Sequence, residues 1–148
     1  MNARDLVGTW YLVSFVARRA DGSAAREPWG PAPAGRLIYT ADGHVAAVLT
    51  KPDRVRFASA DPTGGTVDEM KEAFEGLEAY AGRYEFDEAT SVVRHYTDVA
   101  RLPNWQGASV QRYADLHENE LTLRTAPMTI RSVEVVLSLA WRRIASPG

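Results

Sequence analysis

The sequence predicts an all-β protein: a closed, up-and-down antiparallel barrel of about eight strands, with one helix inserted after the third strand. Three observations favour this class. Segments rich in β-branched and aromatic residues recur along the chain, turn-forming residues separate them, and one segment alone has a helical period. Short strands joined by tight turns are typical of up-and-down barrels rather than Greek keys. At 148 residues, the chain is expected to form a single domain over residues 1–148.

The first expected strand covers residues 8–16, where Thr, Trp, Tyr, Val and Phe dominate. Gly8 allows the backbone to turn sharply into it. Both faces of this strand are mostly apolar, which indicates cover on both sides. We expect the last strand, residues 133–143, to return and lie beside the first, because closure removes both edges of the sheet.

A loop with three prolines follows at residues 27–35, and we expect its Trp29 to cover one end of the barrel. Residues 36–40 and 44–50 are predicted to form a hairpin, since the Asp-Gly pair between them is a strong turn signal. Adjacent alanines in the second of these strands would leave room inside the barrel.

The expected helix begins near Thr66. Thr66 and Glu69 have the capping-box spacing, so each side chain can bond the free backbone amide of the other residue. The apolar residues of this segment fall at spacings of three and four and therefore share one face. They are Val67, Met70, Phe74 and Leu77. The glutamates on the other face are interpreted as a solvated surface, not as a catalytic pair.

Alternating segments separated by turn residues supply the remaining strands. They cover residues 80–86, 91–99, 108–116, 120–125 and 133–143. A loop at residues 101–107, which contains Trp105, interrupts the series.

The charge balance argues against nucleic acids and membranes as partners. The chain has 17 basic and 19 acidic residues, a net charge of -2, so neither nucleic acid nor a membrane is expected to bind. The N-terminus lacks the apolar run of a signal peptide, and no stretch approaches the ~20 apolar residues of a membrane span. These features lead us to expect a cytoplasmic protein.

Motifs for metal and cofactor chemistry are missing from the sequence. The chain has no cysteine, which excludes disulfides, thiol nucleophiles and Cys-ligated metals. The three histidines lack metal-ligand spacing, and no HExxH, GxSxG or GxGxxG motif is present. We therefore expect no metal and no cofactor.

Several motifs resemble those of one family. Gly8-Thr9-Trp10 is similar to the glycine–x–tryptophan opening of lipocalins and fatty-acid-binding proteins. Further resemblance lies in residues 35–44, 53–54, 56–59, 103–105 and 141–143. Taken together, these segments make nearly the whole chain resemble the bacterial lipocalin-like domain family, whose members are calycin-type β-barrels.

This resemblance implies a cavity rather than a particular catalytic residue. It also implies that Arg142 or Arg143 stacks on Trp10 and seals one barrel end, a cation–π contact worth about 0.5–2 kcal/mol. Some small barrels of related shape act as isomerases or cyclases in natural-product pathways, so the resemblance leaves an enzyme open.

Strand parity decides which side chains face the interior of such a barrel. Inward parity at Trp10 would place Leu12 and Ser14 in the cavity as well, and we list these three as ligand-binding candidates. Of the neighbours Gln111 and Arg112, we expect Gln111 to face inward and to bind ligand, and Arg112 to face water. An arginine inside the barrel would instead bind a carboxylate or enolate.

His95 is the leading candidate for catalysis and also for ligand binding. It belongs to the less polar set of its strand, which is expected to face inward and comprises Val93, His95, Thr97 and Val99. An ordinary pKa of about 6.5 would let His95 move a proton at neutral pH. The alternative is a core histidine that is hydrogen-bonded to a neighbour.

Tyr39 and Tyr84 are further candidates for both roles, since a hydroxyl in an apolar barrel needs a partner and a ligand carbonyl would serve. The alternative for both tyrosines is a place in the wall with the hydroxyl at the rim. Trp105 lies in a loop, where it would either contact ligand or cap the core.

Three functions remain open at this point. The first is binding of a small, mostly hydrophobic metabolite in the cavity. The second is a cofactor-independent isomerase or cyclase in which His95 or a tyrosine moves a proton. The third is a packed barrel that acts through its surface, for example as a homodimer. A cavity above ~300 Å³ would argue against the third, and open space beside a buried His95 would favour the second.

Overall fold

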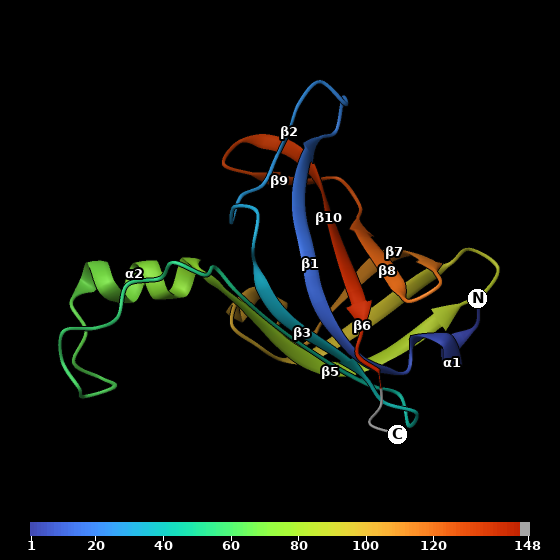
Figure 1. The fold of residues 1–148 in the computed structure, drawn as a ribbon, viewed down its shortest axis with the longest axis horizontal. Helices are drawn as coiled ribbons and strands as arrows, with labels where there is room; N and C mark the ends of the chain where they lie inside the picture. The colour runs from blue at the N-terminus through green and yellow to red at the C-terminus, as the bar shows by residue number, and fades with distance from the viewer. Residues whose placement is uncertain (146–148) are drawn as a thin grey trace.

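In the computed structural model, which describes residues 1–145, antiparallel strands close into a barrel of eight (Figure 1). The barrel strands are β1 (Gly8–Arg19), β3 (Ala34–Tyr39), β4 (His44–Thr50), β5 (Leu77–Asp87), β6 (Val92–Ala100), β7 (Ala108–His117), β8 (Glu120–Thr125) and β10 (Val133–Arg143). Barrel neighbours follow chain order, and β10 pairs with β1 along most of its length. The predicted fold class and the closure of the last strand on the first are thus confirmed.

Four short elements were not predicted. Two are the strands β2 (Ala25–Arg26) and β9 (Met128–Ile130), which extend the sheet beside β1 and β10. The others are the helix α1 (Ala3–Leu6) and the 3-10 turn η1 (Pro103–Trp105). Within the described residues, no helix is long and apolar enough to cross a membrane.

One end of the barrel is closed by α1 and by the ends of β1 and β10. Leu6 is fully buried there, and its carbonyl oxygen accepts a hydrogen bond of 2.9 Å from Trp10 Nε1. The Arg143 guanidinium lies 4.1 Å from the centroid of the Trp10 ring and donates to the carbonyl oxygen of Val7 at 2.6 Å. The stacking implied by the resemblance is therefore made by Arg143, whereas Arg142 is exposed.

A bulge in β1 corrects the expected position of Ser14. Leu12 pairs with Trp141 and Ser14 with Ala140, so one extra residue stands between them on β1. A bulge of this kind exchanges the two faces of a strand. Trp10 and Leu12 are buried as expected, but beyond the bulge Phe15 faces the interior and Ser14 does not line it.

A second bulge, opposite Ala81 and Gly82, interrupts β6. His95 and Thr97 are buried as expected, whereas Val99 beyond the bulge is 57% exposed, contrary to expectation. Gly82 permits the close approach, because a Cβ atom on it would lie 1.8 Å from the backbone oxygen of Tyr96.

The predicted helix, α2 (Val67–Glu75), lies between β4 and β5 and projects from the barrel (Figure 1). Its capping box is formed as expected: the Glu69 amide donates to Thr66 Oγ1 at 3.1 Å, and the Thr66 amide donates to Glu69 Oε1 at 2.9 Å. Its apolar face stays largely outside the core, since Val67 is 80% exposed and Met70 47% exposed.

Candidate ligand-binding cavity

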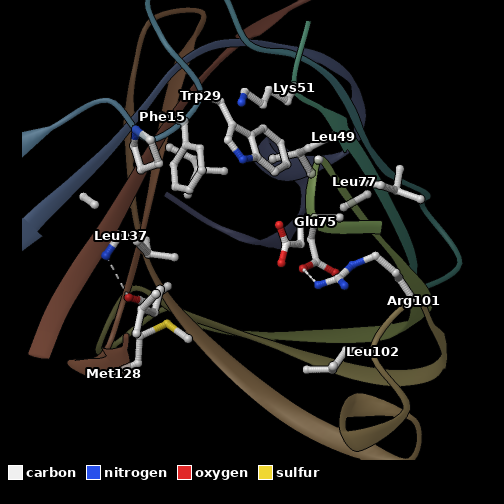
Figure 2. A pocket seen from close by; sticks show the side chains of 18 of the residues that line it. Phe15, Trp29, Leu49, Lys51, Glu75, Leu77, Arg101, Leu102, Met128 and Leu137 are labelled. Atoms are coloured by element: carbon white, nitrogen blue, oxygen red, sulfur yellow. Dashed lines mark hydrogen bonds and ion pairs between the residues drawn. The ribbon is translucent and has the colours of Figure 1, made fainter. Parts of the chain in front are cut away.

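The barrel encloses a cavity of about 610 Å³ (Figure 2). Its mouth lies where β4 ends and β5 begins, at the opposite end from Trp10 and α1. Apolar side chains from several strands form most of the wall. They include Phe15, Leu37, Leu49, Leu123, Leu139 and Trp141. A cavity of this size lies in the usual range for small-molecule sites.

The mouth combines aromatic and charged side chains (Figure 2). Trp29, in the proline-rich loop, meets Phe15 edge-on at 5.3 Å between ring centroids, so it covers this end as expected. Arg101 forms an ion pair of 3.0 Å with Glu78 and lies 4.1 Å from the centroid of the Phe74 ring. The cation of Arg101 is therefore already compensated by the protein itself.

The structure reverses the expected parity of β7. Arg112 lines the cavity and Gln111 does not. Gln111 lies instead beside Arg94, whose guanidinium donates to the Gln111 amide oxygen at 3.0 Å. Arg112 shares its face with Ala114, which is buried in the core, so the packing of β7 carries the arginine inward.

His95 is fully buried between two tyrosines. Its Nε2 lies 2.7 Å from the Tyr39 hydroxyl, and its Nδ1 lies 2.7 Å from the Tyr80 hydroxyl. Burial, together with the positive charge of Arg112, lowers the pKa of His95 from 6.5 to about 3. The ring is therefore neutral at physiological pH, and it stands behind the cavity wall rather than in it.

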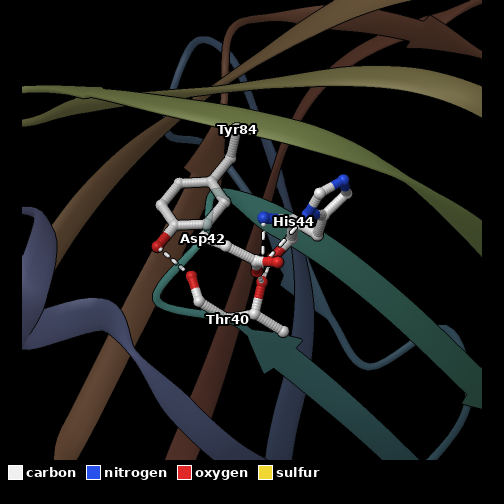
Figure 3. A network of polar contacts seen from close by, with 4 residues as sticks. All are labelled: Thr40, Asp42, His44 and Tyr84. Atoms are coloured by element: carbon white, nitrogen blue, oxygen red, sulfur yellow. Dashed lines mark hydrogen bonds and ion pairs between the residues drawn. The ribbon is translucent and has the colours of Figure 1, made fainter.

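The two candidate tyrosines also lie outside the cavity wall. Tyr39 is 1% exposed, and burial raises its pKa well above the usual range, with the nearby Tyr80 adding to the rise. Tyr84 donates through its hydroxyl to the backbone oxygen of Thr40 at 2.9 Å, in the β3–β4 turn at the closed end (Figure 3). Figure 3 also shows that Thr40 bonds Asp42 and the His44 amide, so Tyr84 belongs to the network that holds this turn.

Among the sequence-based candidates, Trp105 alone lines the cavity. Trp10, Leu12, Ser14, Tyr39, Tyr84, His95 and Gln111 do not. The most informative residue missed is Tyr80, which lines the cavity and contacts His95. A signal for it existed, because Tyr80 and Tyr84 are four apart on one strand and share a face.

Glu72, Glu75 and Glu78 line the cavity, together with several basic residues. Over residues 1–145, no group of three or more His, Asp or Glu side chains lies close enough together to hold a metal ion.

Comparison with known proteins agrees with this architecture. A family model described as a lipocalin-like domain matches residues 7–144. The chain is 25% identical over 107 residues to the 4'-hydroxy-3'-methoxypropiophenone carrier protein ppsC of Aspergillus oryzae, a match covering 68% of this chain and 96% of that protein.

Two solved structures are also similar. A lipocalin-like protein from Bacteroides uniformis aligns with a TM-score of 0.47 and 15% identity, covering 95% of this chain and 99% of that one. The REP1-NXSQ fatty acid transporter aligns with a TM-score of 0.45 and 11% identity, covering 98% of this chain and 100% of that one. On the evidence of the family model, which spans nearly all of the barrel, the chain belongs to the lipocalin-like domain family.

Proposed function

We propose that this protein binds a small, mostly hydrophobic molecule in the barrel cavity. The observation that carries the proposal is the cavity of about 610 Å³, whose wall is mostly apolar and whose mouth opens between loops. Enclosed apolar pockets with a few polar groups are the usual sites for small molecules. A space of this volume also argues against a solid barrel that acts through its surface alone.

The similarity to a named carrier protein supports a binding role rather than a catalytic one. It extends over 107 residues, 68% of this chain. We place Trp105 among the ligand contacts, because it lines the cavity and meets Tyr80 edge-on at 6.4 Å between ring centroids.

The isomerase or cyclase hypothesis gains no support from the position of His95. Both ring nitrogens are engaged by tyrosine hydroxyls, and the ring does not reach the cavity. A general base must come within hydrogen-bond reach of the proton that it moves. Proton transfer by His95 would therefore have to pass through Tyr80.

The proposal is tested by filling the cavity from one strand. Ala47 lines it from β4, while its neighbour Val48 points outward and is 48% exposed. We expect wild-type protein to bind the uncharged fluorophore 1-aminoanthracene saturably, Ala47→Trp to lose this binding, and Val48→Trp to keep it. Leu139→Trp blocks the cavity from β10 and serves as a second variant, and circular dichroism checks the fold of each.

Equal probe binding by the blocked and control variants, with the fold intact, would place the probe outside the barrel and contradict the proposal.

A further inference from the structure

Arg112 is a cation in the cavity wall without an acidic partner. Its Nη1 donates to the backbone oxygen of Gln111 at 2.8 Å, but no carboxylate of residues 1–145 forms an ion pair with it. Arg101 at the mouth differs, since Glu78 neutralises it. Glu72 and Glu75 also line the cavity, but neither forms an ion pair with Arg112. Because a cation drawn away from water is costly unless it is paired, Arg112 marks a position in the wall where the protein supplies no counter-charge.

The buried hydroxyl of Tyr39 determines which ring nitrogen of His95 carries the proton. The only polar atom within hydrogen-bond distance of this hydroxyl among the described residues is His95 Nε2, at 2.7 Å. A buried hydroxyl proton requires an acceptor, so Tyr39 donates to Nε2. A neutral imidazole has one donor and one acceptor nitrogen, and the proton of His95 therefore sits on Nδ1.

With the proton of His95 on Nδ1, the Tyr80 hydroxyl can donate its own proton toward the cavity. His95 Nδ1 donates to the Tyr80 oxygen at 2.7 Å, so the hydroxyl proton of Tyr80 must point elsewhere. Burial raises the pKa of Tyr80, and the positive charge of the nearby Arg112 opposes that rise. A guanidinium has no acceptor atom, so Arg112 cannot accept the Tyr80 proton. Tyr80 lines the cavity, and its proton is thus free for an occupant.

We propose that the cavity selects amphipathic molecules with one anionic oxygen, a carboxylate or a phenolate or enolate, held between the Arg112 guanidinium and the Tyr80 hydroxyl. The two groups together present several donors and no acceptor, which suits an anionic oxygen and disfavours an amine. The apolar remainder of the molecule lies against the aliphatic and aromatic wall. This inference rests on the proposed function and adds the chemical class of the ligand.

Matched pairs of ligands test the inference. Decanoate is compared with its methyl ester, and an acidic nitrophenol with its methyl ether, each in competition with 1-aminoanthracene. In at least one pair, we expect wild-type protein to bind the anion at least tenfold more tightly than its uncharged partner. Which pair shows this preference identifies the head group as a carboxylate or a phenolate. Arg112→Met should remove that preference, while Arg124→Met, which removes an exposed arginine from the neighbouring β8, should preserve it.

Tyr80→Phe is a second variant that leaves the charge unchanged. It should weaken binding of the anion about three- to tenfold and of its uncharged partner much less. A further readout is the nitrogen NMR spectrum of His95, in which the proton is expected on Nδ1. A proton found on Nε2 of His95 would contradict the assignment of the Tyr80 hydroxyl as a donor to the ligand.

The outcomes separate this inference from the proposed function. If 1-aminoanthracene binds but each anion and its uncharged partner compete equally, with or without Arg112, the ligand class is wrong and the binding function stands. If neither the fluorophore nor any competitor binds, the proposed function fails and the inference fails with it.

Discussion

At the scale of single residues, Arg143 combines a cation–π contact with two hydrogen bonds at the closed end of the barrel. Its guanidinium stacks on Trp10 and bonds the backbone oxygens of Asp5 and Val7, so it ties α1 and the first and last strands together. Arg142 beside it is exposed and faces the other side of the sheet.

We expect Arg143→Leu to lower the free energy of unfolding by about 2–4 kcal/mol, from a lost cation–π contact and lost hydrogen bonds to buried carbonyl groups. Arg142→Leu should change it by less than about 0.5 kcal/mol, as is usual for an exposed position. Urea denaturation of both variants measures the difference. Equal losses would show that the seal at the closed end contributes little.

At the scale of elements, α2 has no buried residue. It is held by its cap, by the stacking of Arg101 on Phe74 and by hydrogen bonds from residues 54–58. An exposed helix of this length depends on local interactions, and its first turn depends on the Thr66 and Glu69 side chains.

Thr66→Ala should therefore destabilise α2 by about 1 kcal/mol while leaving the barrel intact. We expect faster amide hydrogen exchange over residues 67–75 and an unchanged Tm. Thr63→Ala, in the exposed loop before the helix, is the control and should not alter exchange within the helix. A clear fall in Tm for Thr66→Ala would mean that the helix and the barrel unfold together.

At the scale of the whole molecule, the buried His95 couples barrel stability to pH. Its pKa is about 3 in the folded protein because burial and Arg112 disfavour its charged form, whereas the unfolded chain has the ordinary value of 6.5. Between these values the unfolded state binds more protons, so lowering the pH favours unfolding.

We expect the free energy of unfolding to fall as the pH drops below 6.5, with a contribution from His95 of about 1.4 kcal/mol per pH unit. Between pH 6 and about pH 5 the ordinary pKa values of the carboxyl groups lie below the working range, so the contribution of His95 dominates the slope. His95→Gln should flatten the slope there, and His117→Gln, which replaces an exposed histidine, should retain it. Urea titrations at several pH values measure it, and an unchanged slope in His95→Gln would contradict the assignment.

The predictable part of the fold depended on local signals. The Asp-Gly turn between β3 and β4, the capping box of α2 and the alternation in most strands each arise from neighbours in sequence, and each is present in the structure. The burial of His95 was likewise readable from the polarity of the two faces of β6.

The site was harder to predict. Two bulges interrupt the inward and outward alternation of their strands, and one arginine faces the interior although arginines are usually exposed. The bulges in β1 and β6 exchange inward and outward faces, which displaced Ser14 and Val99 from the expected interior. Arg112 was expected in water on general grounds. The alternative, that it follows Ala114 and its apolar neighbours inward, was visible in the pattern but outweighed by the cost of burying a charge.

By itself, then, the sequence determined the closed all-β architecture, since alternation, turn residues and capping residues act within a few positions of one another. Only the tertiary structure decided which of its aromatic and charged residues face the cavity. That choice depends on bulges and on the pairing of strands distant in sequence, as when Gly82 admits the backbone of Tyr96 and β1 meets β10. Local patterns carry no information about such pairings, because they arise from packing between segments far apart in the chain.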